Sequence, residues 1–210
     1  MGKGTVARAV AAALGLHHID TGAMYRALAW RAGQLGLNLD DEDRMARLAA
    51  ECAIEIDGSQ VAVDGQDASH AIRTPDIDRA TTRVARLSRV REALVARQRG
   101  LAEAGGVVME GRDIGTVVFP DADLKIFLDA SPEERARRRA HDPAHTSSQT
   151  QALADIAQAM QRRDENDRTR QASPLTQAPD AVLIDTTSLP VQRVIDRVLA
   201  LVRDRLPAAR

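Results

Sequence analysis

The sequence predicts an α/β protein in which helices flank a parallel β-sheet. Two observations carry this prediction. Short apolar runs, of the kind that parallel sheets bury, alternate with longer helix-prone segments, and a glycine-rich string stands directly before the first of these segments. The predicted buried strands are residues 16–19, 107–110, 124–129 and 181–185. We expect one compact unit, because no repeat and no low-complexity linker divides the 210 residues.

Helices are predicted between these strands, and two of them carry recognisable start signals. The pair Asp40-Asp41 can cap a helix that runs to about residue 52, and the string Ser131-Pro132-Glu133-Glu134 is a capping box with proline at the first helical position. The other expected helices are 5–14, 23–35, 76–87, 88–103, 151–167 and a last one that opens at Pro190.

One stretch departs from this alternation of strand and helix. Apolar β-branched residues alternate with polar or small ones on either side of Asp57-Gly58, which is typical of an antiparallel β-hairpin. These residues are Ile54, Ile56, Val61 and Val63. We therefore expect an inserted antiparallel element outside the parallel sheet.

Charge and composition exclude several classes of function. The formal net charge is −1 and the pI about 6.5, so the chain is not a polycation that coats nucleic acid. Residues 73–99 are nonetheless basic, which a solvated helix face explains most simply. No apolar run is long enough to span a membrane. The single cysteine, Cys52, fits a buried thiol in a reducing, cytoplasmic setting.

No protein-held metal site is expected from the sequence. His17 and His18 are neighbours, but no cluster of Cys or carboxylate residues with metal-ligand spacing surrounds them. We therefore expect them to be structural or surface histidines.

The glycine-rich string matches the rear of a phosphate-binding loop. The P-loop pattern G-x-x-x-x-G-K-[ST] precedes a helix, and Gly2-Lys3-Gly4-Thr5 matches its end with one extra glycine. In such loops backbone N–H groups and the helix N-terminus enclose phosphates, while the lysine neutralises charge. Only Met1 stands before Gly2, so we expect the front of the loop and the strand before it to be missing from this chain. A chain made from Met1 is then expected to be poorly stable and nearly inactive.

Three longer strings are more specific than this loop. Residues 20–26 (Asp-Thr-Gly-Ala-Met-Tyr-Arg) and 110–120 (Glu-Gly-Arg-Asp-Ile-Gly-Thr-Val-Val-Phe-Pro) each follow a predicted strand, at the sheet edge where open α/β folds bind ligands. Residues 162–170 (Arg-Arg-Asp-Glu-Asn-Asp-Arg-Thr-Arg) follow a predicted helix. Judged by composition alone, the second string would form a salt bridge within a loop, and the third would be the solvent-exposed end of a helix.

In order and over nearly the whole chain, these strings resemble those of bacterial cytidylate kinases. The resemblance implies a P-loop nucleoside monophosphate kinase fold whose first central strand is missing here. It divides the single kinase domain, 1–210, into a core (1–36, 106–130 and 171–210), an inserted monophosphate-binding segment at about 37–105, and a helical lid at about 131–170. The inserted segment accounts for the hairpin.

The resemblance also implies roles for individual residues. Those expected at ATP are Gly2, Lys3, Gly4 and Thr5 in the loop, with Arg138 and Arg139 in the lid. Thr5 is expected near the magnesium ion that arrives with ATP. Those expected at the acceptor nucleotide are Thr21, Tyr25, Arg26, Thr82, Arg91, Arg112, Asp113, Arg163, Asp167 and Arg170. The neighbouring lid arginines leave the choice of ATP clamp open.

Within the acceptor set, the resemblance separates three tasks. Arg26 and Arg112 would bind the phosphate, while Arg170 reaches toward phosphate. The cytosine edge would be recognised by Thr82, where serine is commoner in the family, together with Arg91 and Asp113. Arg163 and Asp167 would contact the sugar hydroxyls. Catalysis would depend on Lys3, Arg112, Arg163 and Arg170.

The implied activity is Mg²⁺-dependent transfer of the ATP γ-phosphoryl group to CMP or dCMP, in pyrimidine nucleotide metabolism. Such a transfer needs mainly positioning and charge neutralisation, which suits a site rich in arginine. The partners would be these nucleotides, without nucleic acid or membrane, and the protein would be a cytoplasmic monomer. Two alternatives stay open: a different P-loop kinase, acting on AMP or shikimate, and a truncated remnant that binds pyrimidine nucleotide or a partner without turnover.

Overall fold

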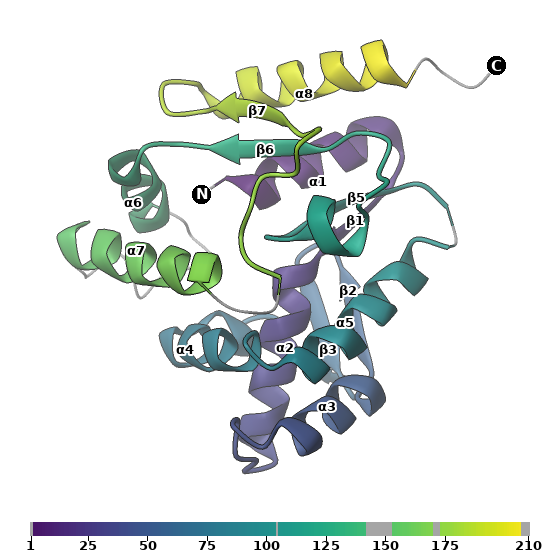
Figure 1. Ribbon diagram of the computed structural model, residues 1–210, viewed down its shortest axis with the longest axis vertical. Coiled ribbons are helices and arrows are strands. Elements are labelled where there is room, and N and C mark those ends of the chain that lie inside the picture. The colour runs from purple at the N-terminus through teal and green to yellow at the C-terminus, as the bar shows by residue number, and fades with distance from the viewer. Residues whose placement is uncertain (1, 104, 142–152, 170–172, 207–210) are drawn as a thin grey trace.

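The computed structural model describes residues 2–103, 105–141, 153–169 and 173–206. It confirms the predicted α/β architecture of parallel strands flanked by helices (Figure 1). The predicted strands and helices are all present in the described ranges, with ends shifted by a few residues. The predicted start of the helix at 151 lies outside the described residues.

The parallel strands form two separate pairs within the part of the chain that the structure describes. Strand β1 (His17–Asp20) pairs with β5 (Val107–Glu110), and β6 (Ile126–Asp129) pairs with β7 (Val182–Asp185). Both pairs are parallel and in register from end to end. The polar last residues of β1 and β5 therefore lie side by side, at the carboxyl edge where ligands bind in such folds.

Two helices hold these pairs together. Helix α1 (Lys3–Leu14) and helix α8 (Val191–Arg205) share one apolar cluster. Val108 of β5 and Ile126 of β6 pack against this same cluster. The cluster therefore joins the two strand pairs although their backbones are not hydrogen-bonded to each other.

The largest core lies in the lower half of the view in Figure 1. It is built by α2 (Thr21–Gln34), α3 (Glu42–Glu51), α4 (Pro75–Val84) and α5 (Ser88–Leu101). Asp41 caps α3, as predicted, by accepting a hydrogen bond from Arg44 N at 3.1 Å. Cys52 lies in this core as the predicted buried thiol, and its burial raises the pKa of the thiol.

The predicted hairpin is present and has a third strand. β2 (Ile54–Asp57) pairs with β3 (Gln60–Val63), and β3 continues through a second tight turn into β4 (Gln66–Asp67). The second turn is Asp64-Gly65, where φ is 49° and 76°. Positive φ at both central residues matches a type I′ turn, which suits the right-handed twist of paired strands. A 3₁₀ turn, η1 (Ala71–Arg73), leads on to α4.

Helices α6 (Pro132–Ala140) and α7 (Leu153–Thr169) pack against each other on one side of the molecule (Figure 1). The predicted capping box is confirmed, because Ser131 Oγ accepts a hydrogen bond from Glu134 N at 3.2 Å. The α6–α7 pair approaches α4, and the contact is polar: Arg139 Nη2 donates to Asp78 Oδ2 at 2.5 Å.

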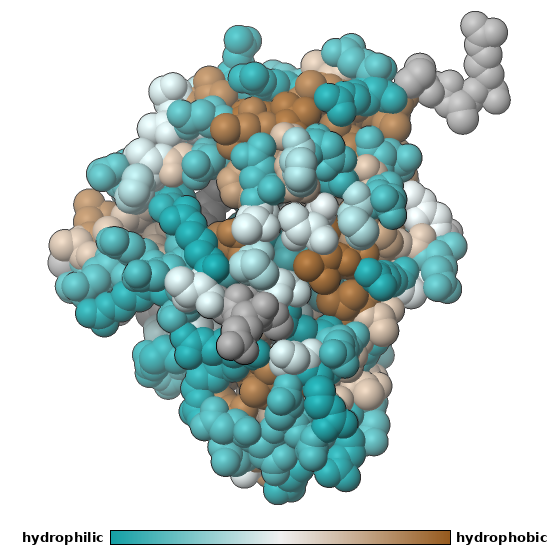
Figure 2. All heavy atoms as spheres, in the orientation of Figure 1, coloured by the Kyte–Doolittle hydropathy of each residue, from teal (hydrophilic) through white to brown (hydrophobic). Residues whose placement is uncertain are grey.

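The surface is mostly hydrophilic in the view of Figure 2, with apolar residues gathered over α8 and β7. Leu183 and Val191 are exposed large apolar residues of these elements. Among the described residues, no helix combines the length and the apolar character that a membrane crossing requires.

Candidate active site

The first turn of α1 lies against the carboxyl ends of β1 and β5. Gly2 caps the helix with φ at 75°, a conformation that glycine adopts without strain. A Cβ on Gly4 would come within 2.8 Å of Glu110 Oε1, so a larger residue at this position would require the Glu110 carboxylate to move. Glu110 also pairs with His18, whose Nε2 lies 3.1 Å from Oε1. The start of α1 is thus lined by a half-buried carboxylate.

A cavity of about 410 Å³ opens beside this helix start. Among its lining residues are Gly2, Thr5 and Arg138, three of the residues expected at ATP. The rest of the lining comes from α1, β6, α6 and the residue after it, the start of α8 and the loop before α8: Val6, Leu128, Glu134, Arg137, His141, Thr186, Leu189, Pro190, Val191 and Val194. The structure therefore brings Gly2 and Thr5 of the loop and Arg138 of α6 to a single hollow, which Lys3 and Gly4 do not line.

Arg138 is held in this cavity by partners on two elements. Its Nε donates to Glu134 Oε1 at 2.7 Å, and its Nη1 donates to Thr186 Oγ1 at 2.9 Å. Hydrogen bonds from Arg137 and Arg138 lower the pKa of Glu134 to about 2, so this carboxylate is ionised at neutral pH. The arginine is consequently fixed in position before any ligand arrives.

Arg139 points elsewhere. Its guanidinium reaches Asp78 on α4, as described above, and it does not line the 410 Å³ cavity. Of the two lid arginines expected at ATP, the geometry favours Arg138.

The second group of site residues surrounds the junction of β1 and α2. Asp20 caps α2 by accepting a hydrogen bond from Ala23 N at 3.0 Å, and its other oxygen accepts one from Arg26 Nη2 at 3.1 Å. Thr21 Oγ1 donates to the carbonyl of Glu110 at 2.8 Å. The last residues of β1 and β5 therefore position Thr21 and Arg26 directly.

Gly111 makes this junction possible. A Cβ at this position would lie 2.5 Å from Thr21 Oγ1 and 2.6 Å from Ile114 Cδ1. Thr21 cannot move away easily, because it is buried and hydrogen-bonded to Glu110. The loop that carries Arg112 and Asp113 thus packs so closely on the start of α2 that residue 111 has no room for a side chain.

A buried ion pair forms the centre of this loop. Arg91 of α5 donates to Asp113 Oδ2, and the two residues are only 4% and 7% exposed. The guanidinium carbon of Arg91 lies 5.6 Å from the ring centroid of Tyr25, within the range of a cation–π contact. Thr82, on the neighbouring α4, donates its hydroxyl to the carbonyl of Asp78 at 3.1 Å.

Arg99 fixes the same loop from a second point on α5. Its Nε and Nη2 donate to the carbonyls of Val118 and Val117 at 2.9 and 2.8 Å. These carbonyls end a single π-helical turn, η2 (Ile114–Val118), of the kind often found at functional sites. The loop is therefore bound to α5 at both of its ends.

Arg112 faces α7 instead of α5. Its Nη1 lies 3.0 Å from Asp164 Oδ1 and also pairs with Asp167, both on α7. Asp164 pairs in addition with Arg135 of α6. Burial alone would raise the pKa of Asp164, but the guanidinium groups of Arg112 and Arg135 outweigh burial and hold that pKa below its usual value.

The structure thus brings Thr21, Arg26 and the start of α1 to the ends of β1 and β5, whereas Thr82 and Arg139 contact Asp78 of α4. Arg170 and the side chain of Arg163 lie outside the described residues, so their predicted positions stay predictions. Lys3 opens α1 and is engaged in an interaction of its own.

Sequence reasoning assigned no role to several carboxylates of the site: Asp20, Asp78, Glu110 and Asp164. Three of the four belong to the strings quoted above, so a rule that pairs each expected arginine with a nearby carboxylate would have selected them. Among the described residues no three His, Cys, Asp or Glu side chains form a metal-holding group.

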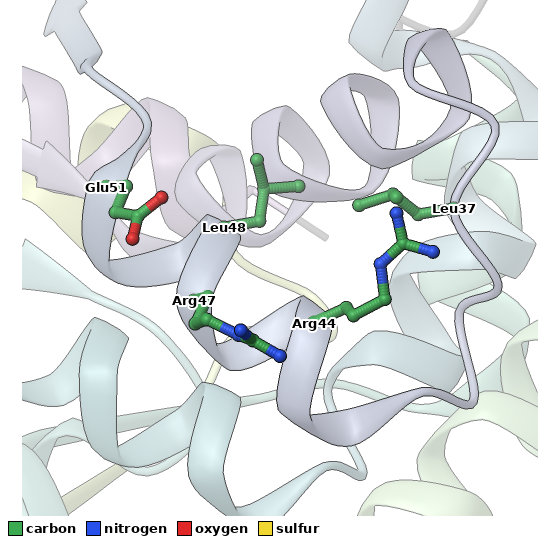
Figure 3. Close-up of a pocket in the computed structure, with 5 residues that line it drawn as sticks. All are labelled: Leu37, Arg44, Arg47, Leu48 and Glu51. Atoms are coloured by element: carbon green, nitrogen blue, oxygen red, sulfur yellow. The ribbon is translucent and has the colours of Figure 1, made fainter.

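A second hollow lies away from this site. It has a volume of about 300 Å³ and is lined by Leu37, Arg44, Arg47, Leu48 and Glu51 on and beside α3 (Figure 3). None of the predicted site residues lines it.

Comparison with known proteins agrees with the resemblance in the sequence. The family model described as cytidylate kinase matches residues 1–204. The chain is 46% identical to a cytidylate kinase of Desulfitobacterium hafniense, over 98% of this chain and 89% of that protein. It is 47% identical to a cytidylate kinase of Geobacillus kaustophilus, over 98% of this chain and 93% of that protein. It is 44% identical to a cytidylate kinase of Solibacter usitatus, over 100% of this chain and 90% of that protein.

Proposed function

The chain belongs to the cytidylate kinase family and is a nucleoside monophosphate kinase, and we propose that it transfers the γ-phosphoryl group of ATP to CMP or dCMP. In this reaction an oxygen of the acceptor phosphate forms a bond to the γ-phosphorus, and the bond from that phosphorus to the bridging oxygen of ADP breaks. The products are CDP or dCDP, together with ADP.

The observation that carries the proposal is the buried Arg91–Asp113 pair beside Arg112. A carboxylate and a guanidinium present an acceptor and donors, and the cytosine edge offers an amino donor and ring acceptors. In the described contacts, Arg91 donates to only one carboxylate oxygen of Asp113, Oδ2. A base with the wrong pattern would leave these buried groups unpaired, at a cost of about 1–3 kcal/mol for each group.

The acceptor phosphate is assigned to Arg26 and Arg112. Both side chains are mostly buried and are held by carboxylates, Arg26 by Asp20 and Arg112 by Asp164 and Asp167. These partners place the guanidinium groups at the strand ends before the substrate binds. Preorganised charge of this kind stabilises the negative oxygens of the transferring group.

The donor nucleotide is assigned to the 410 Å³ cavity, with Arg138 on its wall and the start of α1 at its end. Backbone N–H groups at the start of a helix have no partner within the helix and attract phosphate. Lys3, the first residue of α1, would neutralise charge on the transferred group. We assign residues 131–170 to a lid that excludes water and residues 37–105 to acceptor binding, within a single domain.

The residues at the start of α1 fit a magnesium ion that arrives with ATP. Mg²⁺ prefers oxygen ligands, and the Thr5 hydroxyl lines the donor cavity while the Glu110 carboxylate lies against Gly4. When bound, the ion would neutralise charge on the β- and γ-phosphates. Thr5 would hold it, and Glu110 would contact its hydration shell.

The test is a side-by-side measurement of ADP release with CMP, dCMP, UMP, AMP and shikimate as acceptors. We expect CMP and dCMP to give the highest kcat/KM. Preference for AMP or shikimate would overturn the assignment of Arg91 and Asp113 to the base. The ratio of kcat/KM for CMP to that for dCMP in the same assay measures how strongly the site, with Asp167 in it, recognises the sugar hydroxyl.

We further propose that the protein is a cytoplasmic monomer and that it acts on nucleotides rather than on nucleic acid. Size-exclusion chromatography tests the monomeric state.

One observation favours a second candidate, a chain that binds pyrimidine nucleotide with little turnover. Within the described residues, β5 and β6 are not hydrogen-bonded to each other, so the parallel strands remain two pairs. This candidate supposes that two strand pairs without hydrogen bonds between them hold the donor phosphates weakly. Calorimetry with CMP and with ATP separates the two: CMP binding without ATP binding supports the second candidate.

A further inference from the structure

Asp164 holds Arg112, as described above, and it also makes a contact that the proposed function does not use, with Arg135 of α6. It lies on α7 and is 7% exposed, so its charge is removed from water. Burying an ionised carboxylate is costly unless it is paired and hydrogen-bonded. The partners of Asp164 therefore decide what this residue can do.

Those partners come from two different parts of the molecule. Asp164 Oδ1 accepts a hydrogen bond from Arg112 Nη1 at 3.0 Å, and Arg112 belongs to the loop after β5. Asp164 Oδ2 accepts one from Arg135 Nη1, and Arg135 lies in the first half of α6. One carboxylate thus uses one oxygen for the acceptor-site loop and the other for the lid helix.

The charge on this bridge is maintained at neutral pH. Burial alone would raise the pKa of Asp164, but the two guanidinium groups more than offset burial and lower that pKa. The carboxylate consequently stays ionised while it accepts hydrogen bonds from both arginines. A change in the charge near one arginine must alter how strongly Asp164 holds the other.

We propose that Asp164 is a positioning residue that couples occupancy of the acceptor site to the lid helix α6. The inference rests on the proposed role of Arg112 toward the acceptor phosphate. When that phosphate pairs with Arg112, Asp164 shares this arginine with a second anion and shifts toward Arg135. The lid helix is then held more firmly while the acceptor is bound.

The experiment measures amide hydrogen exchange in residues 132–140 with and without CMP. The variants are Asp164→Asn, Asp164→Glu and Arg135→Gln, and the matched control is Asp155→Asn, an exposed residue on the same helix. In the unmodified chain and in the control, CMP is expected to slow exchange in α6 about fivefold, at the lower end of usual couplings between sites. In Asp164→Asn and Arg135→Gln we expect CMP to change the exchange rate of α6 by less than about twofold.

Activity gives a second readout that a merely structural residue would not produce. We expect Asp164→Asn to lower kcat about tenfold, because the lid no longer follows the acceptor, while the calorimetric Kd of CMP changes little. Asp164→Glu keeps a carboxylate that can reach both arginines, so it should recover part of both effects. If Asp164→Asn destabilises the fold, Arg135→Gln removes the same bridge from its more accessible end.

Two results separate this inference from the proposed function. If CMP binds Asp164→Asn and still slows exchange in α6 about fivefold, Asp164 does not couple the two sites and the inference is wrong. If calorimetry shows no CMP binding to the unmodified chain, the proposed function fails and the inference fails with it. CMP binding together with loss of the α6 response in both bridge variants supports the inference.

Discussion

The acceptor and donor sides of the site are built in different ways. On the acceptor side the ion pair of Arg91 and Asp113 is buried beneath neighbouring elements. On the donor side Arg138 and Glu134 line an open cavity, and their paired side chains are 21% and 15% exposed, more than those of the acceptor-side pair. The comparison teaches that recognition of the acceptor is tied to folding, whereas contacts to the donor can change with little effect on the fold.

The largest expected effect comes from breaking the buried pair. Arg91→Met leaves Asp113 as an unpaired buried carboxylate, so we expect the free energy of unfolding to fall by about 3–5 kcal/mol. Urea unfolding measures this loss, and calorimetry should show that CMP binding is lost as well.

The control for this change is Arg89→Met on the same helix. Arg89 pairs with Asp43, but both side chains are more than half exposed, and such pairs contribute about 0–1 kcal/mol. An equal loss of stability in the two variants would show that burial does not distinguish the acceptor side.

A smaller effect is expected where the acceptor loop touches α2. Gly111→Ala places a Cβ 2.5 Å from Thr21 Oγ1. Overpacking of this kind costs about 1–3 kcal/mol, which thermal unfolding can measure. The position of Arg112 should shift with the loop, so KM for CMP should rise as stability falls.

Gly100→Ala is the matched control, because a Cβ on this residue of α5 meets no heavy atom within 4 Å. Replacing a helical glycine with alanine is expected to stabilise by about 0.5–1 kcal/mol. Opposite signs for the two substitutions would confirm that close packing, and not glycine content, controls the acceptor loop.

On the donor side the expected effect is local. Ser131→Ala removes the cap of α6, at a typical cost of about 1 kcal/mol. We expect faster amide exchange in α6 and weaker ATP binding, because α6 carries Glu134 and Arg138. CMP affinity in the absence of ATP should stay within about twofold, and Ser131→Asp, which retains a capping oxygen, should restore the exchange rate. A large loss of CMP affinity in Ser131→Ala would contradict the separation of the two sides.

The smallest effect concerns pH. Arg137 and Arg138 lower the pKa of Glu134 to about 2, from about 4.3 in an unfolded chain. A lowered pKa means that the ion pairs are complete above about pH 4.3 and are lost as the pH falls toward about 2. Carboxyl NMR titration of the folded protein checks this value. The melting temperature should hardly respond, because Arg137, the first of the two partners, is 61% exposed and solvent screens its pair with Glu134.

Local features of the fold were predictable because their causes lie within a few residues. Asp41 and Ser131 cap helices through contacts three residues away, so their patterns predict the structure directly. The third strand of the hairpin was missed although Asp64-Gly65 is itself a turn signal. The division of the parallel strands into two pairs depends on how distant segments pair, which periodicity does not reveal.

The residues of the site divide in the same way, into local features that were predictable and distant contacts that were not. Arg26 and Arg112 lie just after the ends of β1 and β5, because the strings that contain them begin where these strands end. Their partners were not predicted, since Arg112 meets Asp164 across 52 positions of sequence and Arg139 meets Asp78 across 61. Such pairings depend on how α6 and α7 pack against the rest of the chain.

The two attachments of α5 to the acceptor loop have a consequence for motion. Arg91 holds Asp113 and Arg99 holds the carbonyls that end η2, so the loop can neither rotate nor slide along the helix without losing one of them. The helix, the Arg91–Asp113 pair and the π-helical turn should therefore move as a single rigid body. Any rearrangement that accompanies turnover must then be absorbed where α5 joins its neighbours in the chain, leaving the geometry of this pair, proposed to recognise the base, unchanged throughout the cycle.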